Sequence, residues 1–510
     1  MHQPSGDPGQ MNPAARAVIA WGGDVNLGRR QHARAAALPS PVLDVPVLRE
    51  ADLTIVNLEC VVSPLGTPAL DKGEKGPYHF RARPDMLRVL TEAGVNVVVT
   101  ANNHSGDYGP AAMLDQHRWL AAAGIGQVGS GLDDVQAFRP LWCDAGPFLI
   151  ALFAVDTTQA SSAAGPGRPG HAYLRTADLD GLRKHLAGPI RFARRFASAV
   201  LVAVHAGRNF AAEPDAHSRA FCRTLIDLGA DAVLGASAHV VQGVEIHKGR
   251  PILHDAGDLL FDAVQRQDHR GGVFSLTLGP GGIERVGFTP LRVDFGHSRQ
   301  DEGAHAESTV ACFMARSEAL GSHFTRNADG TAFLALSPQG APWPVRNLPQ
   351  LRAAQVPAPE WLADEVPADA RLPAPCDFGP LRLLGLRIGP PRLDGRALLR
   401  VTSFWRLAAH PLAQDWRLEI RAVCQDGAQP PLAWGGDSDH DPCDWMHPTS
   451  LWRPGLVYRD EVLLRPPPKD RLRSGVLDVL VRVIGPDQRH AWVRMPQRIV
   501  LDLPATRGAA

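Results

Sequence analysis

Val18-Ile19-Ala20-Trp21 is a short apolar run that leads through two glycines to Asp24. Apolar runs of this length are typical of buried strands. The pattern recurs five times. Residues 53–56 lead to Asn57 and Glu59, residues 95–99 to Asn102, Asn103 and His104, and residues 200–204 to His205. Residues 232–235 lead to His239, and residues 252–253 lead through His254 and Asp255 to Asp258. Because ligands gather outside the carboxyl ends of strands in an α/β sheet, we expect these polar side chains to converge on one rim.

Between these runs lie segments that have the start and stop signals of helices. Residues 84–93 begin at a proline and are followed by Gly94, and residues 110–123 and 214–228 repeat this design before Gly124 and Gly229. Proline in the first turn and glycine just past the end is the expected asymmetry of a helix. Strands that alternate with helices predict an α/β domain in the N-terminal half.

A chain of 510 residues is too long for one ordinary core, so more than one domain is expected. Residues 1–15 are polar and rich in proline and glycine, which predicts a flexible tail. Prolines recur through residues 341–375, a composition typical of linkers. From residue 376 to about 505, short β-type runs alternate with turn residues, which predicts an all-β sandwich.

The predicted sandwich is rich in tryptophan, including Trp405, Trp434, Trp445 and Trp452. Aromatic side chains can stack on sugars, but the cores of sandwich domains also use tryptophan. We therefore expect these side chains to pack in the core, with sugar stacking as the alternative.

Charge and composition exclude several classes of function. Lys plus Arg and Asp plus Glu number 53 each, and a net charge of zero gives no case for nucleic-acid binding. No run approaches the ~18 apolar residues of a membrane span, and the N-terminus has no apolar signal-peptide core, so a cytoplasmic location is expected. The 7 cysteines contain no C-x-x-C pair, which argues against a disulfide framework or a structural zinc module.

The residue types at the predicted rim suit a divalent ion of Mn, Fe or Zn. The candidate ligands are Asp24, Glu59, Asn103, His205 and His239, and the candidate catalytic residues are Asp24, Asn103 and His104. Glu59 could bridge two ions, which together could lower the pKa of a bridging water and clamp a phosphoryl group. His104, next to the amide of Asn103, could act as an acid or as a transition-state donor.

Each of these residues also has an ordinary structural interpretation. Asp24 could cap a helix, the pair Asn102-Asn103 could form a turn, and a lone histidine after a strand is commonly a hydrogen-bonded structural residue. The recurrence of ligand types at successive strand ends favours a functional cluster instead. Metal-free hydrolysis by a carboxylate pair such as Asp24 and Glu59 is a further hypothesis.

Four motifs follow one another along the chain: Gly23-Asp24-Val25-Asn26, Asn57-Leu58-Glu59, Ala101-Asn102-Asn103-His104 with Asp107-Tyr108-Gly109, and Gly229-Ala230-Asp231 with His239. In this order they resemble the motifs of the CapA family of capsule and poly-γ-glutamate synthesis proteins. The family is similar to the calcineurin-like metallophosphoesterases, so the resemblance implies a four-layer α/β/β/α sandwich over residues 16–340. It also implies that Asp24 anchors a metal ion and that Glu59 is the carboxylate that bridges two ions. Asn103 and His104 would form the Asn-His pair of the family, and His205 and His239 would be the histidine ligands from the later part of the chain.

Three positions depart from the pattern of that superfamily. Asn26 stands where metallophosphoesterases usually have a histidine, and the segment 235–239 holds one histidine where family members usually carry two. Asp258 stands where the family often has an asparagine, and His254 is a candidate replacement for the missing histidine. A site with one metal ion, or an inactive site, is consistent with these departures.

The resemblance implies a metal-dependent hydrolase or transferase in capsule or poly-γ-glutamate production. Its partners would be a polymer, either poly-γ-glutamate or a polysaccharide, or the enzymes that make the polymer. The alternative is a non-catalytic component of a polymer-assembly complex with a degenerate metal site. The sequence identifies neither the bond attacked, nor the metal, nor the oligomeric state.

Overall fold

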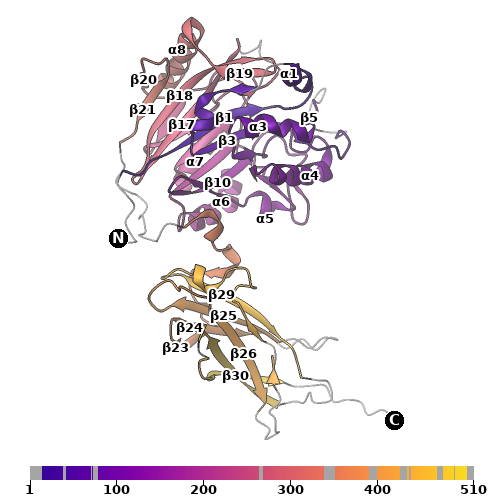
Figure 1. The fold of residues 1–510 in the computed structure, drawn as a ribbon, viewed down its shortest axis with the longest axis vertical. Helices are drawn as coiled ribbons and strands as arrows, with labels where there is room; N and C mark the ends of the chain where they lie inside the picture. Colours follow the sequence, from indigo (N-terminus) through magenta and orange to yellow (C-terminus); the bar gives the residue numbers. More distant parts are fainter. Residues whose placement is uncertain are drawn as a thin grey trace, which may run out of the picture. The chain divides into compact units, whose positions relative to one another are not determined.

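The computed structural model describes residues 14–37, 42–69, 72, 78–262, 268–337, 351–389, 399–424, 433–435, 438–467, 475–487 and 489–501. The chain divides into two compact units, Met1–Ala354 and Gln355–Ala510 (Figure 1). Most of the expected tail, residues 1–13, and the first part of the expected linker, residues 341–350, lie outside the described residues.

The first unit is a mixed α/β fold that contains two large sheets. The eleven-stranded sheet has the order β2-β19-β18-β17-β1-β3-β6-β7. In addition, β16 pairs with β1, β21 pairs with β18, and β20 pairs with β21. Its strands are β1 (Ala17–Val25), β2 (Leu43–Asp44), β3 (Leu53–Leu58), β6 (Val97–Val99), β7 (Gly126–Val128), β16 (Asp258–Leu260), β17 (Arg270–Gly279), β18 (Gly282–Asp294), β19 (His297–Gln300), β20 (Thr325–Arg326) and β21 (Ala332–Ala335). The strands β1, β3, β6 and β7 are parallel, and β17 pairs antiparallel with β1.

The six-stranded sheet has the order β14-β15-β13-β12-β10-β9. Its strands are β9 (Leu141–Ala145), β10 (Phe148–Asp156), β12 (Ala199–His205), β13 (Ala232–Ala236), β14 (Val244–His247) and β15 (Arg250–Leu253). All six predicted runs form strands, but three lie in the first sheet and three in this one. The residues of the expected rim therefore follow strands of two different sheets.

The helices of the first unit begin and end close to the predicted proline and glycine signals. They are α1 (Gln31–Ala37), α2 (Pro46–Glu50), η1 (Pro84–Leu87), α3 (Arg88–Glu92), α4 (Gly109–Ala122), α5 (Asp134–Ala137), α6 (Leu179–Ala193), α7 (Ala216–Leu228) and α8 (Gly303–Ala319). Gly229 has a φ of 117°, a left-handed conformation that ends α7 at little steric cost. The helix begins at Ala216 and not at Pro214, because the Asp215 side chain accepts hydrogen bonds from the backbone of His217 and Ser218. Among the described residues, no helix is long and apolar enough to cross a membrane.

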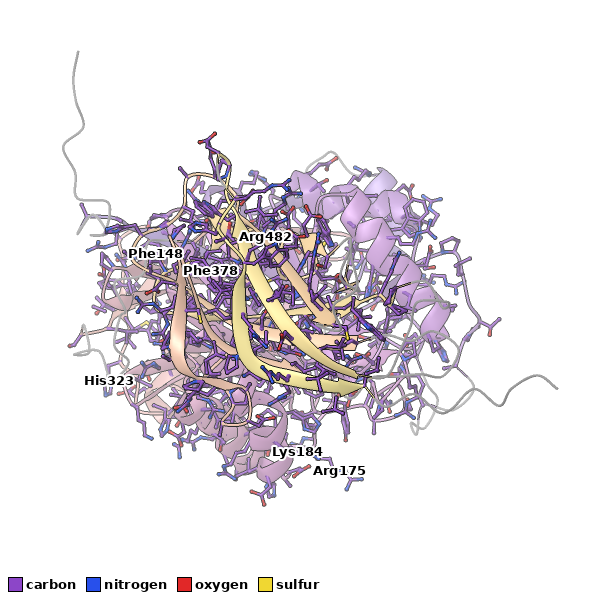
Figure 2. The ribbon with its side chains drawn as sticks, turned by 90° about the horizontal axis from the view of Figure 1, so that it is seen from below. Phe148, Arg175, Lys184, His323, Phe378 and Arg482 are labelled. Atoms are coloured by element: carbon purple, nitrogen blue, oxygen red, sulfur yellow. The ribbon has the colours of Figure 1, made fainter. Side chains whose placement is uncertain are left out.

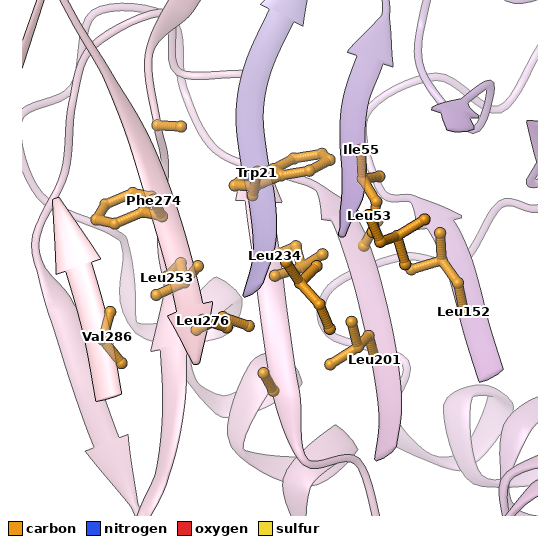
Figure 3. Packing of buried hydrophobic residues seen from close by; sticks show 14 of the residues in the cluster. Trp21, Leu53, Ile55, Leu152, Leu201, Leu234, Leu253, Phe274, Leu276 and Val286 are labelled. Atoms are coloured by element: carbon orange, nitrogen blue, oxygen red, sulfur yellow. The ribbon is translucent and has the colours of Figure 1, made fainter. Parts of the chain in front are cut away.

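Three clusters of buried side chains organise this unit. One cluster joins the two sheets and includes Trp21 of β1, Leu201 of β12 and Leu234 of β13 (Figure 3). A second packs α2, α3 and α4 against the other face of the first sheet, and a third packs α6 and α7 against the second sheet. Lys184 of α6 is exposed at the outer edge of the ribbon in Figure 2, whereas Phe148 at the start of β10 is buried.

The second unit contains two five-stranded antiparallel sheets. One consists of β22 (Leu362–Ala363), β23 (Arg371–Phe378), β24 (Leu381–Ile388), β25 (Leu399–Leu407) and β29 (Val457–Leu464), and the other of β26 (Arg417–Cys424), β27 (Ala433–Trp434), β28 (Asp439–His440), β30 (Gly475–Ile484) and β31 (Val493–Leu501). Trp405, Trp434 and Trp452 are buried, as expected for core residues. Trp445 is 57% exposed, so the expectation of core packing is wrong at this position.

Candidate metal centre

The two glycines before Asp24 bend β1 towards the start of β16. The register of β1 with β3 shifts between Trp21 and Asp24, and Gly23 has a φ of 73°. A Cβ at Gly23 would lie 2.2 Å from the carbonyl oxygen of Gly257, so only glycine permits this close approach. The backbone N–H of Asp24 then donates to that carbonyl at 3.1 Å.

Strand register accounts for much of the convergence of the polar side chains. In the first sheet, Asp24 pairs with Asp258 on one side and with Asn57 on the other. In the second sheet, His205 pairs with Asp156 and with Ala236. The centre is therefore built where the carboxyl ends of strands from both sheets meet.

Asn57, which was not among the predicted ligands, connects Asp24, His205 and Asn102 through its side-chain amide. Its Nδ2 donates to Asp24 Oδ1 at 2.7 Å and lies 3.2 Å from His205 Nδ1, and its Oδ1 accepts from Asn102 Nδ2 at 3.0 Å. Because both amide hydrogens and the oxygen have partners, the side chain is held in one orientation. The motif Asn57-Leu58-Glu59 contained this signal, but the sequence could not show which side chains Asn57 contacts.

Glu59 lies at the centre of the predicted ligand set and is 1% exposed. Its Oε1 is 3.8 Å from His104 Nε2, 3.8 Å from His205 Nε2 and 3.9 Å from His239 Nε2. These separations are too long for hydrogen bonds. They are compatible with ligands of one ion, since bonds of about 2.0–2.2 Å keep two ligand atoms within roughly 4.4 Å of each other.

The other oxygen of Glu59, Oε2, is buried and has no hydrogen-bond partner among the described residues. A buried carboxylate oxygen without a partner carries a large desolvation penalty. A cation bound beside Glu59 would remove that penalty, so the residues present fit a divalent metal ion.

His239 brings a second group of potential ligands together. One potential ligand atom each from Asp24, His239 and Asp258 lie within 4.8 Å of one another. His239 Nδ1 is 2.8 Å from Asp258 Oδ1 and 3.4 Å from Asp24 Oδ2. Asp258 thus lies where a ligand is needed, although its sequence position had not been included in the predicted ligand set.

The loop that carries His239 has an unusual backbone. Ser237 and His239 have φ values of 108° and 58°, which non-glycine residues rarely adopt. The Ser237 N–H donates to Asp24 Oδ2 at 3.1 Å, and the Ala238 N–H donates to Asp255 Oδ2 at 2.6 Å. Strained backbone of this kind is concentrated at functional sites, where neighbouring contacts hold it in place.

Asn103 and His205 meet directly across the centre. His205 Nε2 lies 3.0 Å from Asn103 Oδ1, and the other ring nitrogen, Nδ1, lies 3.2 Å from Asn57 Nδ2. Asp156, the neighbour of His205 in register, pairs with buried His171 at 3.0 Å. Sequence reasoning missed both Asp156 and His171.

His104 is oriented by neighbours on two sides. Its Nδ1 lies 2.7 Å from Asp107 Oδ2, and its ring stacks on Phe80 with centroids 4.0 Å apart. Asp107 in turn forms a buried ion pair of 2.6 Å with Lys72. The contact with Asp107 directs the opposite nitrogen, Nε2, towards Glu59.

Burial changes the proton affinities of the centre in opposite directions. Burial raises the pKa of Glu59 well above its ordinary value, and it lowers the pKa of His104 and of His205 to about 4. Burial also disfavours the charged form of His239, but the carboxylates of Glu59 and Asp258 outweigh it and raise its pKa well above 6.5. His104 and His205 are therefore neutral near pH 7, the form in which imidazole binds metal ions.

Two other residues singled out in the sequence have structural partners. His254 Nε2 lies 3.2 Å from Glu245 Oε2, so its expected role as a replacement for the missing histidine is not supported by its contacts. Asn26 Oδ1 accepts from the backbone of Gly28 at 2.8 Å and forms a turn. Position 237 contributes its backbone N–H to Asp24, as described above.

The chain is thus a mixed α/β protein in which two sheets meet at a buried centre of carboxylates, amides and imidazoles. Residues 18–263 match the family described as "Bacterial capsule synthesis protein PGA_cap". This stretch, just under half of the chain, is similar to that family, in agreement with the resemblance to the CapA family that the motifs indicated.

Relatives with similar sequences carry names from polymer synthesis. A "Probable polyglutamine synthesis accessory protein" of Mycobacterium tuberculosis (strain CDC 1551 / Oshkosh) is 31% identical over 216 residues, 41% of this chain and 56% of the relative. The "Capsule biosynthesis protein CapA" of Bacillus anthracis is 22% identical over 56% of this chain and 68% of the relative. The "PGA biosynthesis protein CapA" of Bacillus subtilis (strain 168) is 25% identical over 49% of this chain and 63% of the relative.

The chain spans little more than half the length of the mycobacterial relative. A solved structure of a hypothetical protein from Thermus thermophilus aligns with 55% of this chain and 95% of its own, at 17% identity and a TM-score of 0.30. That score is too low to support a shared fold.

Proposed function

We propose that the first unit is a metal-dependent hydrolase or transferase that acts in capsule or poly-γ-glutamate synthesis. The observation that carries the proposal is the buried carboxylate of Glu59, whose Oε1 is surrounded by three histidine nitrogens and whose Oε2 has no partner among the described residues. The names of the relatives support the pathway, and the chemistry of the centre supports the reaction class.

The proposed ligands are Asp24, Glu59, Asn103, His205, His239 and Asp258. Carboxylate, amide and neutral imidazole groups suit Mn, Fe or Zn. When bound, such an ion supplies Lewis acidity and lowers the pKa of water. The network through Asn57 holds Asp24 and His205 in fixed orientations before any ion arrives, which favours tight binding.

His104 is the proposed proton-transfer residue. Asp107 accepts the hydrogen of Nδ1, which leaves the lone pair of Nε2 available on the side of Glu59. In this form the imidazole would accept the proton that the attacking water loses and would then donate it to the leaving group. The stacking of Phe80 and the ion pair of Asp107 with Lys72 hold that geometry.

The proposed arrangement of the first unit is the four-layer α/β/β/α sandwich that the family resemblance implied. Three apolar clusters support this arrangement: one packs helices against the first sheet, one packs the two sheets against each other, and one packs helices against the second sheet. The second unit is proposed as an accessory β-sandwich domain, on the support of its two antiparallel sheets.

The test is turnover by protein stripped with a chelator and then reloaded with Mn, Fe or Zn. The assay follows cleavage of bis(p-nitrophenyl) phosphate and of poly-γ-glutamate. We expect activity only after reloading, and a loss of at least about a hundredfold in Glu59→Gln. The matched control is Glu50→Gln, which changes an exposed glutamate at the end of α2. Activity that survives chelation would favour instead hydrolysis by Asp24 and Glu59 without metal.

A non-catalytic role in polymer assembly is the second candidate. It is favoured by the single histidine in residues 235–239 and by the word "accessory" in the name of the mycobacterial relative. In that case the reloaded protein would cleave neither substrate, and affinity purification from cells would recover polymer-synthesis enzymes. If the protein is inactive and affinity purification recovers no polymer-synthesis enzyme with it, this second candidate is contradicted.

A further inference from the structure

The second unit contains a cavity of about 910 Å³ that the metal centre does not explain. Its walls come from β25, β28, β29 and the segment that follows β28, and they include Trp361, Trp445, Arg400, Arg459 and Glu461. The volume is within the range of roughly 300–1,000 Å³ that is typical of pockets for small ligands. All of these residues lie in the second unit.

Trp445 is the exposed aromatic group of this cavity. Its side chain is 57% exposed, while Trp405, Trp434 and Trp452 are buried. A large aromatic face exposed at the wall of a cavity offers a surface on which a ligand can stack. The apolar face that C–H groups form on one side of a pyranose ring is a suitable cover for an indole.

The backbone that presents Trp445 is strained. Cys443, Asp444 and Trp445 are three consecutive non-glycine residues with φ values of 60°, 55° and 66°. Residues of L chirality visit this left-handed region singly, not in runs. Such a conformation persists where neighbouring contacts enforce it, and it is found preferentially at ligand sites.

Asp460 enforces this turn from inside the unit. Its carboxylate is buried, accepts from the Cys443 N–H at 2.9 Å and lies 2.9 Å from His440 Nε2. The other ring nitrogen of His440 is 2.7 Å from the carbonyl oxygen of Ser438. The wall of the cavity is therefore rigid before a ligand arrives.

The charges of the cavity argue against a polyanion. Three arginines and four carboxylates line it among the described residues. Glu461 lies 3.3 Å from Arg400 and 2.7 Å from Arg459, and with the other carboxylates counted the lining has no excess of arginine charge. A polyanion needs uncompensated positive charge, whereas fixed carboxylates and guanidinium groups beside an aromatic face suit hydroxyl groups that both donate and accept.

We propose that this cavity binds a neutral oligosaccharide, with one pyranose ring stacked on Trp445 and its hydroxyl groups bonded to Glu461 and the adjacent arginines. The second unit would then be a glycan-binding module attached to the first unit. The assignment is independent of the metal centre, because its residues all lie in the other unit.

The test is binding of the full chain to an array of neutral bacterial glycans, followed by titration calorimetry with maltopentaose, cellopentaose, chitopentaose and any glycan that binds on the array. We expect at least one ligand, whose affinity falls about tenfold or more in Trp445→Ala and is restored to within about threefold in Trp445→Phe. The matched control is Met446→Ala, which removes a neighbouring side chain that is 68% exposed and changes affinity less than about twofold.

Ionic strength separates this proposal from binding of an acidic polymer. Raising NaCl from about 0.05 to about 0.5 M should change the affinity for a neutral glycan by less than about twofold. Absence of binding to every glycan by wild-type protein would overturn the proposal. So would binding of poly-γ-glutamate that Trp445→Ala retains and that high salt abolishes.

Discussion

His239 Nδ1 lies 2.8 Å from Asp258 Oδ1, and this contact joins a loop after β13 in one sheet to the start of β16 in the other. Both side chains are buried. The contact orients the imidazole, because the nitrogen held by Asp258 fixes the direction of Nε2 towards Glu59.

Replacing Asp258 with asparagine should therefore weaken metal binding. Asp258→Asn keeps the shape of the side chain but removes its charge, and we expect a loss of about 10- to 100-fold in affinity for Mn or Zn. Calorimetric titration of the chelated protein measures the change. The control is Asp227→Asn, which alters a carboxylate paired with the surface imidazole of His247. Equal affinities of Asp258→Asn and wild type would contradict a role for Asp258 in the centre.

Asp107 should control the reactivity of His104 without controlling metal content. In Asp107→Asn the amide can present its N–H to Nδ1 and favour the other tautomer, which protonates Nε2. We expect kcat to fall at least about a hundredfold while the metal content per chain stays unchanged. A variant with normal kcat would show that the orientation of His104 has no part in the reaction.

Trp21 should contribute to stability through one bond between the sheets. Its Nε1 donates to the carbonyl oxygen of Gly235 at 2.9 Å, and its ring is buried in the cluster that joins the sheets (Figure 3). Trp21→Phe leaves that carbonyl without its donor and should lower the free energy of unfolding by about 1–3 kcal/mol. Urea unfolding followed by circular dichroism measures this change. Trp119→Phe, at a 39% exposed position of α4, should change it by less than about 0.5 kcal/mol.

The second unit should lose stability as the pH rises above about 6.5. Burial alone lowers the pKa of His440, but the hydrogen bond and charge of Asp460 outweigh burial and raise the pKa above its ordinary value. The folded state therefore binds this proton more tightly than the unfolded chain does. The resulting stabilisation is complete below the unfolded pKa and is lost as the pH rises through the folded one.

Urea unfolding of the second unit at about pH 6 and about pH 8 tests this linkage. We expect a lower free energy of unfolding at the higher pH, and a smaller difference between the two pH values in His440→Gln, which has no proton to lose. The Cys443 thiol, whose pKa burial raises, adds little in this range, because free thiols titrate at about 8.5. An identical pH dependence in both proteins would contradict the role of His440.

Local patterns in the sequence predicted the strands and helices well. The run before Asp24 forms β1, and glycine at position 229 ends α7, because burial of apolar runs and left-handed glycine are local effects. Pairing between distant strands is not local. The division of the six runs between two sheets, and the register that sets Asp258 directly beside Asp24, depend on pairing between strands far apart in the chain, whereas the sequence predicted only that these side chains converge.

In the candidate site, too, the sequence predicted the identity of residues but not their long-range contacts. Glu59, Asn103, His205 and His239 were named as ligands from their positions after apolar runs, and the structure brings them together. Asn57 acts through contacts on both sides of its amide, which a single sequence does not reveal. Trp445 was expected in a core because hydropathy cannot anticipate a left-handed turn that exposes the side chain.

The most direct test of the account is the metal content per chain, measured by elemental analysis on protein expressed with added Mn, Fe and Zn. We predict about one or two ions per chain in the wild type and in His247→Ala, which removes an imidazole outside the centre. His239→Ala should lose most of this metal while keeping its circular dichroism spectrum. Wild-type protein without metal, or His239→Ala with the full wild-type content, would contradict the central claim.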